Sequence, residues 1–212
     1  MSYVLKLIEE GEHQQQDFKL RIDSSRKIAK TLVAFANTDG GRLLIGVKDS
    51  GKVQGASIEE EIHMIEGAAQ MYCRPTIDYK SQVWHVDNKR VLEILIEPSD
   101  SRPHEAEIEK DQWVAYTRVE DKNFKANGVL QSVWKNEKTW DSGNFEYDKE
   151  KEKLFNYIKR REKITFMTVS KITKLSFKET ETLLGNLILW GVLAMNYGKN
   201  GVYYTLTNEE GD

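Results

Sequence analysis

Residues 12–55 constrain the fold more than any other stretch, because they set a strand, a helix and a second strand in close succession. Residues 17–22 alternate apolar and polar side chains, which predicts a half-buried strand. Asp23 and Ser24 follow, and their side-chain oxygens suit the first-turn amides of a helix that runs to Asn37. The apolar residues of this helix cover a broad face.

The helix is expected to stop at Gly40-Gly41, since glycine adopts left-handed backbone without steric cost. An apolar β run at residues 43–47 and a turn signal at residues 49–52 follow. A pair of glycines can also let backbone amides approach a phosphate. The chain has no GxxxxGK[ST] motif, however, so this pair indicates a helix stop rather than a nucleotide site.

Three blocks in this stretch resemble a known family. The run ending in DFK, the phrase AFANTDGG and the run LLIGVKDSGKVQG are similar to the Schlafen-type AlbA family, whose members are described as DNA-binding domains. The resemblance covers roughly residues 1–135. A later block, YTRVED at residues 116–121, is similar to the arginine-bearing strand of the family. The resemblance implies an α+β fold with a mixed sheet. One residue departs from the pattern, because Asp17 stands where the family usually has glutamate.

The resemblance also implies a candidate catalytic set. In the Schlafen branch, acidic residues at matching points of these blocks are associated with metal-dependent RNA cleavage, and here they are Glu12, Asp17 and Asp49. Convergent carboxylates suit Mg²⁺ or Mn²⁺, which activates water and stabilises charge on phosphate. The alternative interpretation makes Glu12 and Asp17 ordinary loop and strand-end acids and Asp49 a turn former. No cofactor is therefore assigned unless the nuclease interpretation holds.

Composition bounds the architecture. The chain has 212 residues, of which 39% are hydrophobic and 31% charged, so we expect one ordinary domain and a smaller second one. Its one cysteine, Cys73, excludes a disulfide framework and a multi-cysteine zinc site. The chain contains no leader-like segment and no run of 18 apolar residues, which predicts a soluble, cytoplasmic protein without a membrane partner.

The rest of the first domain, residues 1–138, is expected to hold three helices and three strands besides this stretch. The strands are expected at residues 76–86, 91–97 and 112–120, with the apolar 91–97 strand central in the sheet. Between the last two strands lies a polar segment, residues 98–110, which we expect to be an exposed, mobile loop. The helices are expected at residues 3–11, after a Ser57–Glu60 capping box, and from an Asn123 cap to about residue 137.

After an expected linker at residues 139–148, the pattern of residues 149–212 resembles a winged helix-turn-helix domain. An amphipathic helix covers residues 149–161, and a short strand at residues 164–166 precedes a short helix at residues 168–175. Ser176 and Glu179 form a capping box for the third helix, which ends at Gly191. A hairpin then turns around residues 198–201.

Charge indicates where nucleic acid would bind. The net charge is −3, so binding must use local patches. Residues 149–178 contain ten Lys or Arg side chains and three acids, which is enough for a phosphate-facing surface. We expect Thr182 and Asn186 on the third helix near base edges. The expected phosphate contacts are Lys19, Arg21 and Arg118 in the first domain and Lys171, Lys174, Lys178 and Lys199 in the second. Glu181 opposes this interpretation, because it repels phosphate.

The sequence therefore favours a DNA-binding transcriptional regulator whose winged helix contacts double-stranded DNA. The AlbA-type domain would provide dimerisation or an effector response, and a homodimer would match a palindromic operator. Two alternatives stay open. One is the metal-dependent ribonuclease that uses Glu12, Asp17 and Asp49, and the other is a protein-interaction scaffold.

Overall fold

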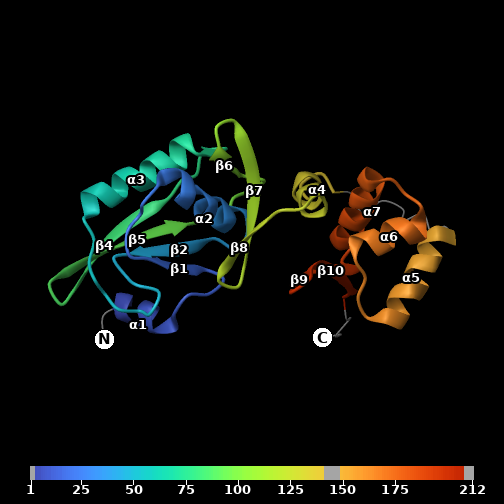
Figure 1. Cartoon of the computed structure of the whole chain (residues 1–212), viewed down its shortest axis with the longest axis horizontal. Helices are drawn as coiled ribbons and strands as arrows, with labels where there is room; N and C mark the ends of the chain where they lie inside the picture. Colours follow the sequence, from blue (N-terminus) through green and yellow to red (C-terminus); the bar gives the residue numbers. More distant parts are fainter. Residues whose placement is uncertain (1–2, 141–148, 208–212) are drawn as a thin grey trace. The chain divides into compact units, whose positions relative to one another are not determined.

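The computed structural model describes residues 3–140 and 149–207, and the chain divides into two compact units, Met1–Ala126 and Asn127–Asp212 (Figure 1). The sequence predicts a domain boundary at residue 138, whereas the contacts within the fold group residues 127–138 with the second unit. Most of the expected linker, residues 141–148, lies outside the described residues.

The first unit is built on a four-stranded mixed sheet with the order β1-β2-β5-β4. Its strands are β1 (Gln16–Lys19), β2 (Gly41–Ile45), β5 (Lys89–Ile96) and β4 (Lys80–Val86). β1 pairs with β2 in parallel, and the other two pairings are antiparallel. The mixed sheet and the internal position of the apolar β5 are both confirmed.

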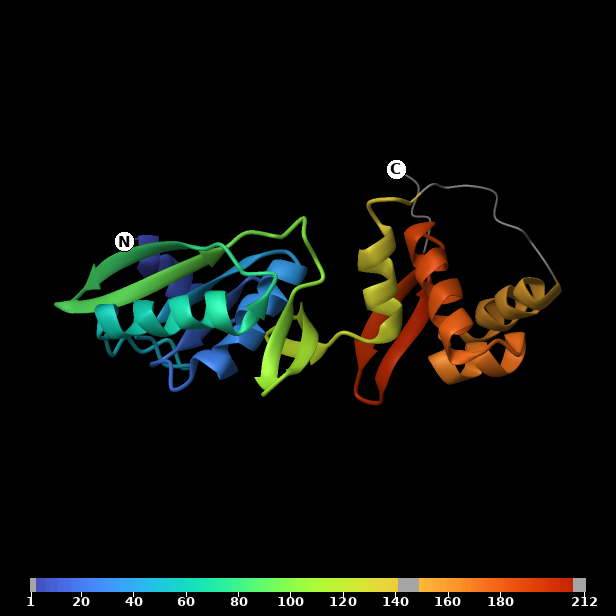
Figure 2. The ribbon, with the colours of Figure 1, turned by 90° about the horizontal axis from the view of Figure 1, so that it is seen from above.

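Helix α2 (Ser25–Asn37) is the most deeply buried helix of this unit. The Ser24 side chain caps it by accepting from the amide of Lys27. Nine of its thirteen residues are buried, including consecutive residues from Thr31 to Asn37, so it is enclosed on nearly all sides. It packs against the first sheet together with α3 (Ile58–Met71), and the two helices share one core cluster with the inward residues of β2 and β5. Figure 2 shows both helices beside the sheet.

The opposite face of the first sheet is covered by α1 (Tyr3–Glu10). Val4, Leu7 and Ile8 are buried there against Phe18 and Leu44, whose neighbours in the strands point to the α2 side. This alternation follows from the period of two in a strand. The sheet is therefore covered on both faces, which explains why its strands are more apolar than those of a one-sided sheet.

A second four-stranded sheet, of order β3-β6-β7-β8, packs on the other side of α2. It consists of β3 (Cys73–Arg74), β6 (Glu105–Glu109), β7 (Gln112–Val119) and β8 (Lys122–Lys125). The prediction that residues 98–110 form an exposed loop is wrong for residues 105–109. These residues pair with β7, and Ala106 is fully buried. Three glutamates in five residues hide the strand from a pattern search, although their side chains alternate with Ala106 and Ile108.

Two helix starts also differ from the sequence analysis. Ser57 precedes α3 but its side chain makes no capping hydrogen bond, so the expected Ser57–Glu60 capping box is absent. The helix expected from Asn123 begins at Gly128 instead, and Asn127 caps it by accepting from the amide of Leu130. Asn123 itself lies in β8, where its side-chain oxygen accepts a hydrogen bond from Arg118.

The second unit contains α4 (Gly128–Asn136), α5 (Lys149–Arg161), α6 (Phe166–Thr173), α7 (Phe177–Leu189), β9 (Leu193–Gly198) and β10 (Gly201–Leu206). One core cluster joins these helices with the hairpin. Ile164 bridges to Tyr204 of β10, so the short strand ahead of α6 is reduced to a single bridge. The capping box at the start of α7 is confirmed, since Ser176 and Glu179 bond reciprocally.

Helix α4 packs closely along α7. A Cβ atom on Gly185 would lie 3.2 Å from the Ser132 hydroxyl, so the missing side chain permits the close approach. Val129 of α4 is part of the same core as Leu184 and Leu187. Residues 128–136 are therefore an integral part of the second unit rather than an extension of the first.

Among the described residues, no helix is both long and apolar enough to cross a bilayer.

Gly40 should be far less replaceable than Gly11. Both have positive φ, +70° and +76°, so alanine costs about 1–2 kcal/mol of conformational energy at either position. At Gly40 the new Cβ would also lie 2.7 Å from the Ile96 carbonyl oxygen, whereas nothing lies within 4 Å at Gly11. We expect Gly40→Ala to lower the free energy of unfolding by about 1–3 kcal/mol more than Gly11→Ala in denaturant titrations. Equal losses would contradict this packing.

Candidate nucleic-acid interface

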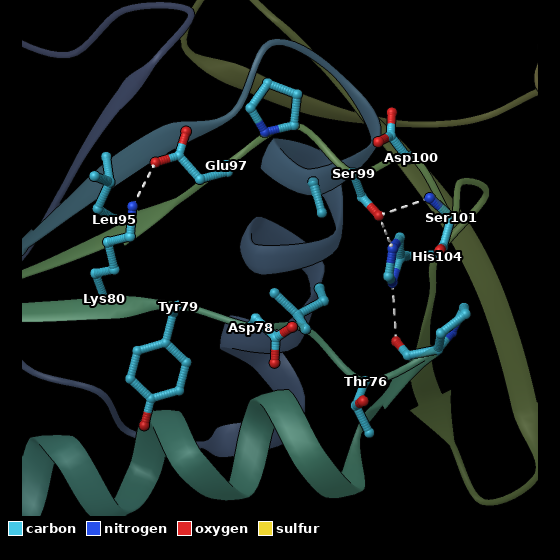
Figure 3. Close-up of a pocket in the computed structure, with 14 residues that line it drawn as sticks. Thr76, Asp78, Tyr79, Lys80, Leu95, Glu97, Ser99, Asp100, Ser101 and His104 are labelled. Carbon is cyan, nitrogen blue, oxygen red and sulfur yellow. Dashed lines mark hydrogen bonds and ion pairs between the residues drawn. The ribbon is translucent and has the colours of Figure 1, made fainter.

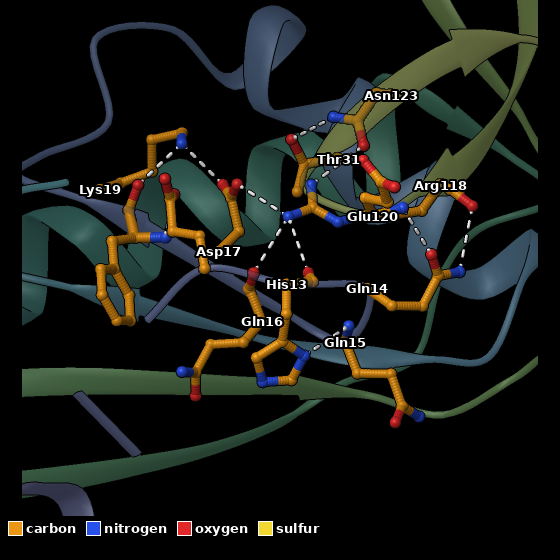
Figure 4. A network of polar contacts seen from close by, with 12 residues as sticks. His13, Gln14, Gln15, Gln16, Asp17, Lys19, Thr31, Arg118, Glu120 and Asn123 are labelled. Atoms are coloured by element: carbon orange, nitrogen blue, oxygen red, sulfur yellow. Dashed lines mark hydrogen bonds and ion pairs between the residues drawn. The ribbon is translucent and has the colours of Figure 1, made fainter. Parts of the chain in front are cut away.

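Arg118 of β7 lies at the centre of a buried polar network (Figure 4). Its side chain is 1% exposed. The guanidinium donates to the carbonyl oxygens of His13 and Gln16, at 3.2 and 3.0 Å, and to the Asn123 side chain at 3.2 Å. It also contacts the Asp17 carboxylate at 3.2 Å. These bonds join β7 and β8 of the second sheet to β1 of the first.

This arrangement contradicts the expected role of Arg118 as a phosphate contact, because its guanidinium is buried and bonded within the protein. Lys19 is partly exposed, but its Nζ lies 2.6 Å from Asp17. Arg21 is exposed and forms a surface pair with Asp23 at 2.8 Å. These three residues therefore do not form a shared cationic surface on the first unit.

The blocks that carry the family resemblance meet around this network. Thr38 accepts from the Arg118 backbone amide at 3.0 Å. Gln14 donates to Asp39 at 2.9 Å and to the Arg118 carbonyl oxygen, and it accepts from the amide of Glu120. The residues around Asp17, Thr38 and Arg118 thus form one connected structure. Their polar groups bond to one another and hold the two sheets together, and they do not form a free binding face.

Sequence reasoning missed two further polar residues at this junction. Asn37 is 1% exposed, and its amide donates to the carbonyl oxygens of His104 and Tyr116 while it accepts from the His104 amide. Gln16 is fully buried and donates to the carbonyl oxygens of Leu7 and Gly11. A buried amide side chain has no periodic signal, since its partners come from distant parts of the chain.

Glu12 and Asp17 lie near each other, but both are engaged by protein groups. Glu12 accepts from the amide of Phe18 at 2.8 Å. Both oxygens of Asp17 face cations, Arg118 on one side and Lys19 on the other. Burial raises the pKa of Glu12, and the charges of Asp17 and Asp49 raise it further, against lowering by the Phe18 amide and Lys19. Asp49 itself is exposed in the turn after β2.

These contacts do not suit a divalent ion. A metal at Asp17 would have to displace two cationic side chains that already neutralise it. Across residues 3–140 and 149–207, no group of three or more His, Cys, Asp or Glu side chains is arranged to hold a metal ion. We therefore derive no metal-dependent step from Glu12, Asp17 and Asp49.

A cavity of about 650 Å³ lies beside the end of β5 and the loop that follows it (Figure 3). On its wall, His104 is 3% exposed; its Nδ1 lies 2.9 Å from the Pro75 carbonyl oxygen and its Nε2 2.7 Å from the Ser99 hydroxyl. A carbonyl oxygen only accepts, so Nδ1 carries the proton and Nε2 accepts from Ser99. Burial lowers the pKa of His104, which keeps the imidazole neutral. These bonds hold the loop of residues 97–104 in place.

The second unit presents its cations differently. Lys171, Lys174, Lys178 and Lys199 are all exposed, and Lys174 takes the left-handed conformation that ends α6. Thr182 is exposed, whereas Asn186 is half-buried. All four expected phosphate contacts of this unit are therefore accessible to solvent, in contrast to Arg118.

A cavity of about 400 Å³ adds to this surface. It lies between the start of α6 and the turn of the β9–β10 hairpin. Lys163 and Lys199 line it together with the hydroxyl-bearing Thr165 and Thr168. Lysine ammonium groups and hydroxyls are donors that suit phosphate oxygens.

Glu181, the acid that opposed DNA binding in the sequence analysis, is turned toward α4. Its carboxylate occupies the space that a Cβ atom on Gly128 would fill, at the first residue of α4, where the helix dipole favours negative charge. It also lies 3.5 Å from Lys178. Glu179 is engaged in the capping box. Both acids of the first two turns of α7 are therefore compensated within the unit.

Removing the buried guanidinium should strongly destabilise the first unit. We expect Arg118→Met to lower the free energy of unfolding by about 3–5 kcal/mol, because the buried Asp17 keeps only Lys19 as a cationic partner and the His13 and Gln16 carbonyl oxygens lose a donor. Adding Asp17→Asn should restore part of the loss. Arg21→Met removes an exposed pair and should cost at most about 1 kcal/mol. Denaturant titrations test this, and equal losses for Arg118→Met and Arg21→Met would contradict the network.

Glu12 predicts a specific pH dependence. Its pKa in the folded protein is raised above the ordinary 4.5, so the folded state binds the proton more tightly than the unfolded state does. The free energy of unfolding therefore falls as pH rises from about 4.5 through the raised pKa. Glu12→Gln keeps an acceptor for the Phe18 amide but does not titrate. The variant should gain stability relative to wild type across this window, and parallel urea-stability curves from pH 4.5 to 7.5 would refute the assignment.

Comparison with solved structures adds two partial likenesses. The crystal structure of the DIP2311 protein from Corynebacterium diphtheriae is 22% identical over 58% of this chain and 27% of its own, with a TM-score of 0.44. The solution NMR structure of the N-terminal domain of "Putative ATP-dependent DNA Helicase RecG-related Protein" from Nitrosomonas europaea is 22% identical over 47% of this chain and 74% of its own, with a TM-score of 0.36. Likeness at this level supports no statement about activity.

The sequence comparison is more specific. Residues 12–127, more than half of the chain, match the family described as Schlafen, AlbA_2. The matched range begins at Glu12, spans the network around Arg118 and ends at the cap of α4. The chain therefore belongs to the Schlafen AlbA_2 family.

Proposed function

We propose that the protein binds nucleic acid, and that its partner is double-stranded DNA in transcriptional control. Family membership supports a nucleic-acid-related function. The observation that carries the proposal is the set of exposed lysines on the second unit, Lys171, Lys174, Lys178 and Lys199. A protein with a net charge of −3 needs such a local patch to hold a polyanion.

We further propose that α5, α6, α7 and the β9–β10 hairpin form a winged helix-turn-helix domain. The order of elements supports this interpretation, since a short helix and a tight turn lead into the capped α7. In such domains the second helix of the motif enters the major groove and its N-terminal residues contact base edges. Here that helix is α7, and the hairpin supplies the wing.

The wing and α6 then hold the backbone of the duplex. Lys199 at the hairpin turn and Lys163 ahead of α6 line one cavity with two threonine hydroxyls, so a phosphate there meets donors from both elements. Lys171 and Lys174 extend the cationic surface along α6. Phosphate contacts of this kind fix register and orientation, whereas base contacts give sequence preference.

Helix α4 sets a condition on this mode of binding. The major groove is about 12 Å wide and admits one helix, and α4 packs along α7 at Gly185. Lys178 and Thr182 line a groove that α4 shares, and Asn186 is half-buried. The first turn of α7, the part that HTH proteins place against base edges, is therefore the better candidate for sequence reading than Asn186.

The AlbA-type unit is assigned dimerisation or an effector response in this proposal. The cavity beside His104, with a volume of about 650 Å³, is of a size that suits a small molecule. A homodimer matching a palindromic site stays a prediction. The contacts of Asp17 give the ribonuclease alternative no support.

Lysine substitutions test the interface. Lys174→Ala or Lys199→Ala should weaken binding to all duplexes alike and lower the slope of log affinity against log salt by about one unit, because each lysine neutralises one phosphate. Lys110→Ala, which removes an exposed lysine of the first unit, is the matched control and should change neither. Fluorescence anisotropy across a salt series measures both quantities, and light scattering of the complex reports how many chains bind one duplex.

If the two lysine variants match wild type and the control, this surface does not hold DNA, and the protein-interaction scaffold becomes the better interpretation.

A further inference from the structure

An exposed aromatic side chain lies within the proposed DNA-binding surface. Phe177 is the first residue of α7, directly after the Ser176 cap, and it is 62% exposed. Its ring contacts that of Phe166, at the start of α6, with 5.5 Å between centroids. Met167, next to Phe166 in the chain, is 50% exposed. The starts of α6 and α7 therefore share an apolar patch, in which the Phe166 contact limits the motion of the Phe177 ring.

The charge around this patch indicates the kind of partner. Lys174 and Lys178 are three residues before and one residue after Phe177, and both are exposed. Glu179 is held by Ser176, and Glu181 is turned toward Gly128. The patch is thus an apolar spot between two exposed cations, Lys174 and Lys178, of which Lys178 also lies 3.5 Å from Glu181. An apolar protein surface would match the phenylalanine alone, whereas a polyanion with apolar groups matches both features.

Duplex DNA presents such a group in its major groove. The thymine C5-methyl is the apolar feature of the groove edge, and phenylalanine is among the side chains that contact it. The position of Phe177 also fits, because the N-terminal residues of a recognition helix approach the base edges. No other aromatic side chain among the described residues of α7 precedes Trp190.

We propose that Phe177 reads a thymine methyl group and is a specificity-determining residue of this protein. The proposal rests on the proposed binding of duplex DNA by the second unit. It assigns sequence preference to the first turn of α7, while Lys174 and Lys178 hold the flanking phosphates.

The test removes the methyl group without changing base pairing. Preferred duplexes are first selected from a random library with the full-length chain. Each thymine of a selected duplex is then replaced singly by uracil. We expect one or two of these replacements to weaken binding by about fourfold, the effect of exposing one buried methyl-sized group, and the remaining replacements to have little effect.

The protein variant completes the comparison. Phe177→Ala should weaken binding to the thymine duplex and abolish the difference between thymine and uracil at the same position. Phe177→Leu, which keeps an apolar contact, should retain part of that difference. Met71→Ala removes a side chain of the first unit that is 67% exposed, and as the control it should leave the difference intact. Thermal unfolding checks that the variants fold, as expected for an exposed position.

The outcomes separate this proposal from the one on which it rests. If wild type selects and binds a duplex but no uracil replacement matters, or if Phe177→Ala keeps the uracil effect, the reading of thymine by Phe177 is overturned while DNA binding stands. If wild type binds no duplex at any salt concentration, both proposals fail. Self-association that depends on Phe177, with unchanged DNA binding, would make the patch a contact between copies of the chain and would also overturn the proposal.

Discussion

The first unit depends on satisfying one buried guanidinium. A charge removed from water is costly unless hydrogen bonds and an opposite charge replace its hydration. Arg118 meets most of this requirement with the carbonyl oxygens of His13 and Gln16, the Asp17 carboxylate and the Asn123 amide oxygen. Its guanidinium also lies over the Phe35 ring of α2, 4.8 Å from the centroid. Because these groups come from β1, α2 and β8, the guanidinium makes this set of contacts only when both sheets are assembled around the helix.

The junction between the two sheets is polar at its other end as well. Asn37, at the end of α2, joins the backbone of His104 and Tyr116, and His104 continues the chain of bonds to Pro75 and Ser99. A buried network of this kind specifies one arrangement, since a shifted strand would leave several groups unpaired. The apolar contacts of α2 supply burial, and the polar groups at its C-terminal end set the register.

This division has a functional consequence. The polar residues that mark the family are used inside the first unit, whereas the second unit leaves the lysines of α6, α7 and the hairpin turn exposed and engages Glu179 and Glu181 of α7 within the unit. The proposed DNA contacts follow this difference in exposure. The folded unit also brings Lys163 to one cavity with Lys199 and sets the Phe177 ring against that of Phe166.

The sequence by itself determined the elements whose signals are local. The cap of α2 at Ser24, the capping box of α7 and the apolar character of β5 all depend on residues a few positions apart, as did the blocks that identify the family. The tertiary structure decided the rest. β6 was hidden by its glutamates, α4 joined the second unit through contacts with α7, and Arg118 was buried rather than exposed. The burial of Arg118 and the packing of α4 depend on partners tens of residues away, and β6 depends on pairing with β7 that its own residue pattern does not reveal. Solvent exposure and pairing are fixed only when those partners are in place.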